Sequence, residues 1–133
     1  PSELAGLDVT EVRTGAAAQA VVSRLHGGSV SGQENGVVYY GSGRGGPQAT
    51  VYVSAFADTG SAADAFRRMD GGIARGGTPF HHRVVNIRSG REVVLTMGLG
   101  QTHYYFQDDN RVFWLSAVPE RAQDALSQLL DAL

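Results

Sequence analysis

The stretch QTHYYFQDDNRVFWLSA, residues 101–117, alternates aromatic and polar residues on both sides of a central Asp-Asp-Asn and predicts a β-hairpin. Asp109 and Asn110 are the expected two-residue loop, because both side chains tolerate the positive φ that a primed turn needs. The core face of this register has the pairs Phe106 with Phe113, Tyr104 with Leu115, and Thr102 with Ala117. The other face has the pairs His103 with Ser116, Tyr105 with Trp114, and Gln107 with Val112.

The only tryptophan of the chain therefore lies on the second face of this hairpin, beside His103 and Tyr105. Exposed aromatic patches often mark interfaces, so His103, Tyr105 and Trp114 are our candidate residues for binding a ligand or a partner. Two alternatives stay open. A helix covers this face, or the register shifts by one residue and turns Trp114 into an ordinary core residue.

Two further hairpins are expected upstream. Residues 36–40 and 50–56 are β-branched and aromatic runs joined by a glycine-rich loop, and residues 82–88 and 92–97 flank a turn at Ser89-Gly90-Arg91. After them, Gly98-Leu99-Gly100 is either a tight turn or a bulge that bends one long strand.

The turn at residues 89–91 allows two registers. We prefer a three-residue loop, which pairs Ile87 with Val93, Val85 with Leu95, and Arg88 with Glu92. A two-residue loop, Ser89-Gly90, would instead set Glu92 beside Ile87 and Asn86 beside Val93. That register would mix charge and amide into both faces of the hairpin.

Three helices are expected. Asp8 with Glu11 has the spacing of a capping box and predicts a first helix over about residues 11–26. Ser61 with Asp64 repeats that spacing and predicts a second helix. The second helix reaches Asp70, and Gly71-Gly72 leaves its continuation to Arg75 open. The third helix starts at Pro119 and has an apolar stripe made of Ala122, Ala125, Leu126, Leu129 and Leu133.

The predicted order of elements is therefore α, β, β, α, β, β, β, α, with short connections that favour antiparallel neighbours. We expect an α+β fold with an antiparallel sheet of about five strands and two or three helices mainly on one face. The length of 133 residues fits a single domain over residues 1–133.

Composition excludes several functions. The formal net charge of -2 argues against a nucleic-acid partner, and no apolar stretch approaches the ~20 residues that a membrane-spanning helix needs. All eleven basic residues are arginine and there is no cysteine, so Schiff-base lysines, disulfides and thiolate nucleophiles are excluded. We expect no cofactor and no membrane insertion within the chain.

The motifs with catalytic or ligand associations also have ordinary interpretations. Residues 41–46, GSGRGG, satisfy GxGxxG, but a proline and a strand follow where a dinucleotide site needs a helix. His81 and His82 are adjacent and point to opposite faces of a strand, so they do not form a metal site with His103. Arg67-Arg68 is typical of a solvated helix face. We predict no catalytic residue and no metal ligand.

The segment GLGQTHYYF, residues 98–106, followed by Phe113-Trp114-Leu115 and an alanine-rich terminal helix, resembles small extracytoplasmic domains of bacterial lipoproteins and anti-sigma-factor-like membrane proteins. The resemblance covers about the last 40 residues and implies a periplasmic or membrane-anchored location, with a cytoplasmic one as the alternative. It implies no site residues. The lack of cysteine and of a methionine at Pro1 leads us to expect an excised exported domain.

From the sequence we predict a non-catalytic binding or protein-interaction module with an unknown protein or small molecule as its partner. A homodimer formed through the aromatic sheet face is one expected mode. A small-ligand sensor with an apolar cleft between helix and sheet is the first alternative. The second alternative is an enzyme in which His103 or His82 meets a carboxylate and Tyr104 or Tyr105.

Overall fold

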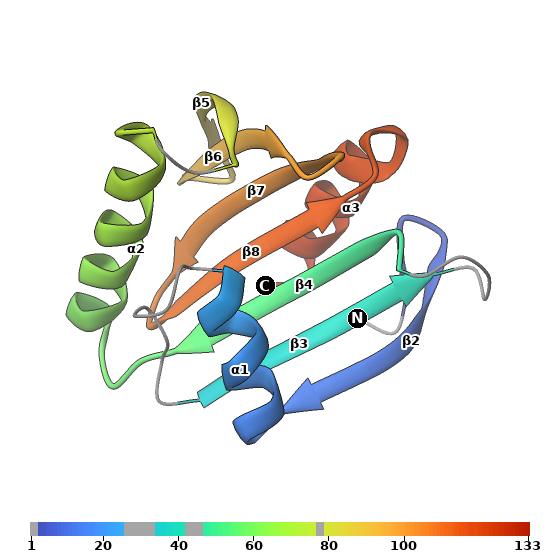
Figure 1. The fold of residues 1–133 in the computed structure, drawn as a ribbon, viewed down its shortest axis with the longest axis horizontal. Coiled ribbons are helices and arrows are strands. Elements are labelled where there is room, and N and C mark those ends of the chain that lie inside the picture. Colours follow the sequence, from blue (N-terminus) through green and yellow to red (C-terminus); the bar gives the residue numbers. More distant parts are fainter. Residues whose placement is uncertain (1–2, 26–33, 42–46, 77–78) are drawn as a thin grey trace.

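The computed structural model describes residues 3–25, 34–41, 47–76 and 79–133, and these form one antiparallel sheet of eight strands with three helices. The elements in chain order are β1 Glu3–Leu4, β2 Leu7–Thr14, α1 Gly15–Leu25, β3 Glu34–Gly41, β4 Ala49–Ala55, α2 Thr59–Ala74, β5 His81–Arg88, β6 Arg91–Gly98, β7 Gln101–Asp108, β8 Arg111–Ala117 and α3 Pro119–Asp131. Across the sheet the strands lie in the order β1-β2-β3-β4-β8-β7-β6-β5 (Figure 1). Strands β4 and β8 join the two halves of the chain.

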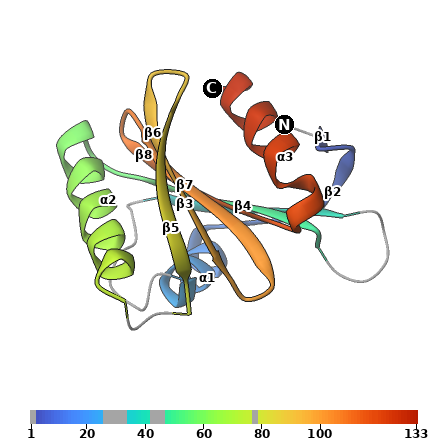
Figure 2. The ribbon, with the colours of Figure 1, turned by 90° about the horizontal axis from the view of Figure 1, so that it is seen from above.

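The prediction of about five strands is wrong. The amino-terminal residues form two additional strands, and Leu99-Gly100 is a two-residue turn that separates β6 from β7. The prediction that the helices lie mainly on one face is wrong too, because α3 covers one face while α1 and α2 lie on the other (Figure 2). The α+β class with an antiparallel sheet is confirmed.

The sheet therefore has a core on each face. Under α3, Phe106, Phe113 and Leu115 pack with Leu126 and Leu129 of the helix. The opposite face, under α2, contains Tyr105 and Trp114 together with Met69 and Ile73 of that helix. A smaller cluster places Ala18 of α1 against Val37.

The first helix differs from its prediction. Asp8 and Glu11 lie in β2 and cap no helix, and α1 starts at Gly15. The spacing of these two acids is compatible with a strand, and pairing of β2 with β3 from Asp8 to Thr14 decides the outcome. Local capping patterns yield to tertiary pairing when the intervening residues are β-branched.

Helix α2 begins earlier than predicted, and it extends into the stretch that the sequence left open. Its N-cap is Asp58, whose side chain accepts a hydrogen bond from the Ser61 backbone N–H, and the helix continues through Gly71-Gly72 to Ala74. Helix α3 begins at Pro119 as predicted, but Leu133 of its expected stripe lies beyond the helix. In the part of the chain that is described, none of these helices has the length and apolar character to cross a membrane.

The β7–β8 hairpin has the predicted register, with Phe106 opposite Phe113, Tyr104 opposite Leu115, and Tyr105 opposite Trp114. The β5–β6 register differs from the one we preferred. Its loop is Ser89-Gly90, with φ of 54° and 76°, and Ile87 lies opposite Glu92. Since the β5 side chains are exposed or half-buried, burial does not penalise this mixture of polar and apolar pairs.

Candidate functional site

The three predicted site residues lie together, but they are buried. The exposed fractions of His103, Tyr105 and Trp114 are 2%, 0% and 1%. The indole of Trp114 on β8 packs against Tyr105 of the neighbouring strand β7 and against Phe80, with ring centroids 5.0 Å apart in each pair. Helix α2 and Phe80 thus form a second layer of core over this face, which is the first of the two alternatives that the sequence left open.

A hydrogen-bond network fixes the ionisation state of His103. The Nδ1 atom lies 2.7 Å from the Ser116 hydroxyl and 3.1 Å from Trp114 Nε1, while Nε2 lies 2.7 Å from the carbonyl of Gly98. An indole N–H only donates and a carbonyl only accepts, so Nδ1 is the acceptor and Nε2 carries the proton. The network describes a neutral imidazole.

Burial lowers the pKa of His103 below its ordinary value, and the hydrogen bond to the Gly98 carbonyl opposes this effect more weakly. The Ser116 hydroxyl beside the ring is 3% exposed. A serine and a histidine are therefore in contact, but no carboxylate joins them in the described network and solvent does not reach them. Their role is to satisfy buried polar groups.

A second network ties α2 to the sheet. The Tyr105 hydroxyl donates to Asp70 at 2.7 Å, and Arg83 of β5 binds the same carboxylate through Nε and Nη2. Burial alone would raise the pKa of Asp70, but the hydrogen bonds from Arg83 and Tyr105 outweigh it and the pKa falls below its usual range. Burial and the Asp70 contact raise the pKa of Tyr105. The tyrosine therefore stays neutral, and the Asp70 carboxylate links α2 to both β5 and β7.

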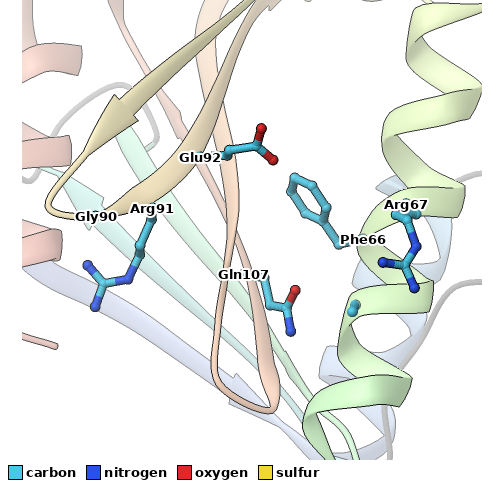
Figure 3. Close-up of a pocket in the computed structure, with 7 residues that line it drawn as sticks. Phe66, Arg67, Gly90, Arg91, Glu92 and Gln107 are labelled. Atoms are coloured by element: carbon cyan, nitrogen blue, oxygen red, sulfur yellow. The ribbon is translucent and has the colours of Figure 1, made fainter.

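A cleft of about 330 Å³ lies between α2 and the neighbouring ends of β6 and β7 (Figure 3). Its lining residues are Ala63, Phe66, Arg67, Gly90, Arg91, Glu92 and Gln107. In Figure 3 the Glu92 carboxylate lies beside the Phe66 ring, whereas the Arg91 guanidinium points away from that ring. Glu92 is therefore the charged group that faces the aromatic wall of the cleft.

Strand β5 is the second candidate surface. It is the last strand of the sheet, and among the described residues it pairs with β6 alone. Val84, Val85 and Ile87 on this strand are large apolar residues with exposed fractions of 49%, 41% and 68%. Exposed apolar side chains on an edge strand are uncommon in monomers, because an open edge can pair with another chain.

The histidines for which the sequence predicts no metal site do not converge with His103. His81 and His82 lie exposed on β5 with ring centroids 4.7 Å apart, while His103 is buried. Within the described ranges no group of three or more histidine, cysteine or acidic residues could hold a metal ion. Residues 42–46 of the glycine-rich motif lie outside the described residues.

Comparison with protein-family models, with curated proteins and with solved structures finds no match for this chain. Sequence reasoning overlooked β5 as a surface and Glu92 as a candidate residue. The signal for β5 was present: HHRVVNIR contains adjacent valines and no regular alternation, which is unusual for a strand that covers a core on one face.

Proposed function

We propose that the protein is a non-catalytic interaction module that forms a homodimer through the edge strand β5. The observation that supports this is the exposure of three large apolar side chains on one edge strand, Val84, Val85 and Ile87. In strand addition, backbone hydrogen bonds supply affinity and neighbouring side chains supply specificity. The dimer would join two sheets of eight strands into one.

The opposite edge of the sheet is less suited to pairing. The short strand β1 pairs with Leu7 and Asp8 of β2, and α3 holds the turn between these two strands through Arg121 and Gln128. The rest of β2 contains a bulge between Val9 and Glu11. It also contains the ion pair of Arg13 with Glu11. Bulges and charges are features that protect an edge.

Strand β5 contains a stretch that can pair in antiparallel fashion with the same stretch of a second copy. After a bulge between His81 and Val84, it pairs with β6 without interruption from Val84 to Arg88, and Asn86 is the centre of that stretch. An antiparallel copy centred on Asn86 sets Val85 opposite Ile87 of the second copy, and Val84 opposite Arg88. Every residue of this stretch then has a partner in the second copy.

Backbone geometry agrees with this register. A two-residue turn is closed by a hydrogen-bonded pair, here Arg88 with Arg91, so the alternate residues Asn86 and Val84 also direct their backbone groups to β6. Val85 and Ile87 then direct theirs outward. In the proposed dimer these two residues face each other as hydrogen-bonded pairs.

The charges favour the same register. Arg88 faces Val84 of the second copy, and Arg83 is neutralised by Asp70 at 2.7 Å. A register centred on Val85 would instead set Ile87 against Arg83 and enter the bulge. Five paired residues bury less than the ~1,600 Å² of a standard interface, so we expect a dissociation constant in the micromolar range.

The experiment uses the absence of cysteine. Asn86→Cys introduces the only thiol of the chain, at a residue that meets itself across the two-fold axis. The expected Cα–Cα distance is about 4.5 Å, which a disulfide can bridge. Mild oxidation of Asn86→Cys should therefore give a covalent dimer at high yield, and sedimentation of the unmodified protein should show a reversible dimer.

Val84→Cys is the matched control, since it lies on the same strand and the same face. In the proposed register the two Val84 residues are about 13 Å apart along the strand, four residues at ~3.3 Å each. Val84→Cys should stay monomeric after oxidation. A monomer in sedimentation at hundreds of micromolar, or equal cross-linking of both variants, would show that this dimer is wrong.

An extracytoplasmic location is also part of this proposal. It rests on the resemblance of residues 98–106 and of the Phe113-Trp114-Leu115 run to exported bacterial domains. Fractionation of bacterial cells that produce the full gene product tests it. Recovery with the periplasm or the membrane is expected, and recovery in the cytosol would contradict it.

A further inference from the structure

The cleft beside α2 contains two arginines that could suggest an anion site, but both are occupied. Arg91 donates from Nε and Nη2 to Asp108, and Arg67 donates to Asp64 at 2.6 Å. Arg111 shares Asp108 with Arg91, but in Figure 3 the Arg91 guanidinium is turned away from the Phe66 side of the cleft, and Arg67 is paired with Asp64.

The groups that remain are acceptors. The Glu92 carboxylate has no ion pair among the described residues. The amide nitrogen of Gln107 donates to the carbonyls of Thr59 and Asp109, which leaves its oxygen as an acceptor. In Figure 3 that oxygen lies on the side of Phe66. The cleft therefore presents one negative charge and one neutral acceptor.

The third component is an aromatic wall. Phe66 is half-buried, and its ring packs at 5.8 Å from the ring of Tyr105 in a tilted arrangement. This contact holds the ring in place, and its remaining surface faces the cleft near Glu92 (Figure 3). Aromatic faces attract cations within about 6 Å of the ring centroid, and a planar guanidinium also stacks on them.

We propose that this cleft binds a guanidinium group, as an arginine side chain supplies it. A guanidinium donates hydrogen bonds in its plane and presents a flat face, which matches the Glu92 carboxylate, the Gln107 oxygen and the Phe66 ring. The volume of about 330 Å³ is large enough for such a side chain and lies at the small end of ligand sites. The cleft borders the β5 edge, since Glu92 lies opposite Ile87, but all of its lining residues belong to one chain and it does not depend on the proposed dimer.

The test is an NMR titration of the full chain with N-acetyl-arginine methylamide. The amide of Gly90 and the side-chain amide of Gln107 should shift in a saturable way. N-acetyl-citrulline methylamide has nearly the same shape without the charge and should bind about tenfold more weakly or not at all. A parallel titration with methylguanidinium separates two sources of the group: comparable affinity indicates a small free ligand, and much weaker affinity indicates a peptide side chain.

Two variants make the proposal falsifiable. Glu92→Gln keeps the size of an exposed side chain and should weaken binding of the arginine probe about tenfold. Phe66→Leu keeps apolar bulk, removes the ring face and should weaken binding as well. Glu120→Gln on α3 is the matched control and should leave affinity unchanged. Equal binding of the arginine and citrulline probes, or unchanged affinity in a folded Glu92→Gln variant, would overturn the guanidinium site.

Discussion

The indole ring of Trp114 stacks on the phenol ring of Tyr105 across the β7–β8 pair, with centroids 5.0 Å apart and an interplanar angle of 8°. Both residues are buried beneath α2, so the face that they form contributes to stability. The proposed dimer depends on a different part of the sheet. Stability and association can therefore be changed separately.

Trp114→Phe tests this separation. The smaller ring leaves a cavity, and loss of the indole N–H leaves the Ser116 hydroxyl and His103 Nδ1 with one donor fewer. We expect a loss of about 2–4 kcal/mol in the free energy of unfolding, measured by urea denaturation. The dimer dissociation constant should stay within about twofold, a change well below 1.4 kcal/mol. A variant that folds with unchanged stability but no longer associates would place Trp114 in the interface.

The buried His103 should make stability depend on pH. Its folded-state pKa lies below the ordinary value of 6.5, so the unfolded chain binds the proton first as the pH falls. Its contribution is complete above about pH 6.5 and is lost below that value. We expect His103 to lower the free energy of unfolding as the pH falls from about 7.5 to about 5.5, with a slope of at most ~1.4 kcal/mol per pH unit.

His103→Gln provides the comparison, because a glutamine side chain does not titrate and can still donate and accept hydrogen bonds. The variant should be less stable at neutral pH and should lose this part of the pH dependence. The difference between the two denaturation series isolates His103 from His81 and His82 on β5. Identical pH profiles would show that protonation of His103 is not linked to unfolding.

The β7–β8 hairpin was predictable because its turn residues and its alternating pattern indicate the same register. In that register Tyr105 lies opposite Trp114 on one face, and the other face also has matched partners. The β5–β6 register was not predictable. Our choice assumed that Ile87 must avoid Glu92, but β5 lies at the edge and Ile87 is 68% exposed. An alternating pattern of apolar residues specifies the register of a strand pair only where one face of the pair is buried.

The site was predictable only in part. The sequence placed His103, Tyr105 and Trp114 on one face, and the structure brings them together. Whether a helix covers that face depends on where α2 packs, a long-range contact that strand periodicity does not encode. The same holds for the cleft, since Phe66 of α2 and Glu92 of β6 are distant in the chain and no local motif joins them.

Two glycines should respond in opposite directions to alanine. A Cβ on Gly98 would lie 2.7 Å from the Pro79 carbonyl oxygen and 3.0 Å from the Phe80 ring, which covers Trp114. Gly98→Ala should therefore destabilise the fold by about 1–3 kcal/mol. A Cβ on Gly72, in helix α2, meets only a flexible Arg75 atom at 3.9 Å, so Gly72→Ala should stabilise it by roughly 0.5–1 kcal/mol. Thermal unfolding of both variants checks the signs, and a neutral Gly98→Ala would show that the Phe80 segment moves freely.

Ile87→Lys should weaken the dimer while leaving the monomer folded. In the proposed register Ile87 meets Val85 of the second copy, so a lysine there buries an ammonium against apolar surface and adds two positive charges to the dimer. Association should weaken about tenfold or more in sedimentation equilibrium, which corresponds to at least ~1.4 kcal/mol. The stability of the monomer should change by no more than about 0.5 kcal/mol, since the side chain is exposed.

Val12→Lys is the matched control for Ile87→Lys. Val12 is 57% exposed on β2, near the opposite edge of the sheet, so the same substitution adds the same charge in a comparable environment. If β5 is the interface, Val12→Lys associates like the unmodified protein. If Val12→Lys weakens association and Ile87→Lys does not, the chains pair through β2. If both weaken it equally, the contact runs from β2 of one copy to β5 of the next, and such a head-to-tail contact would extend into open assemblies instead of stopping at a dimer.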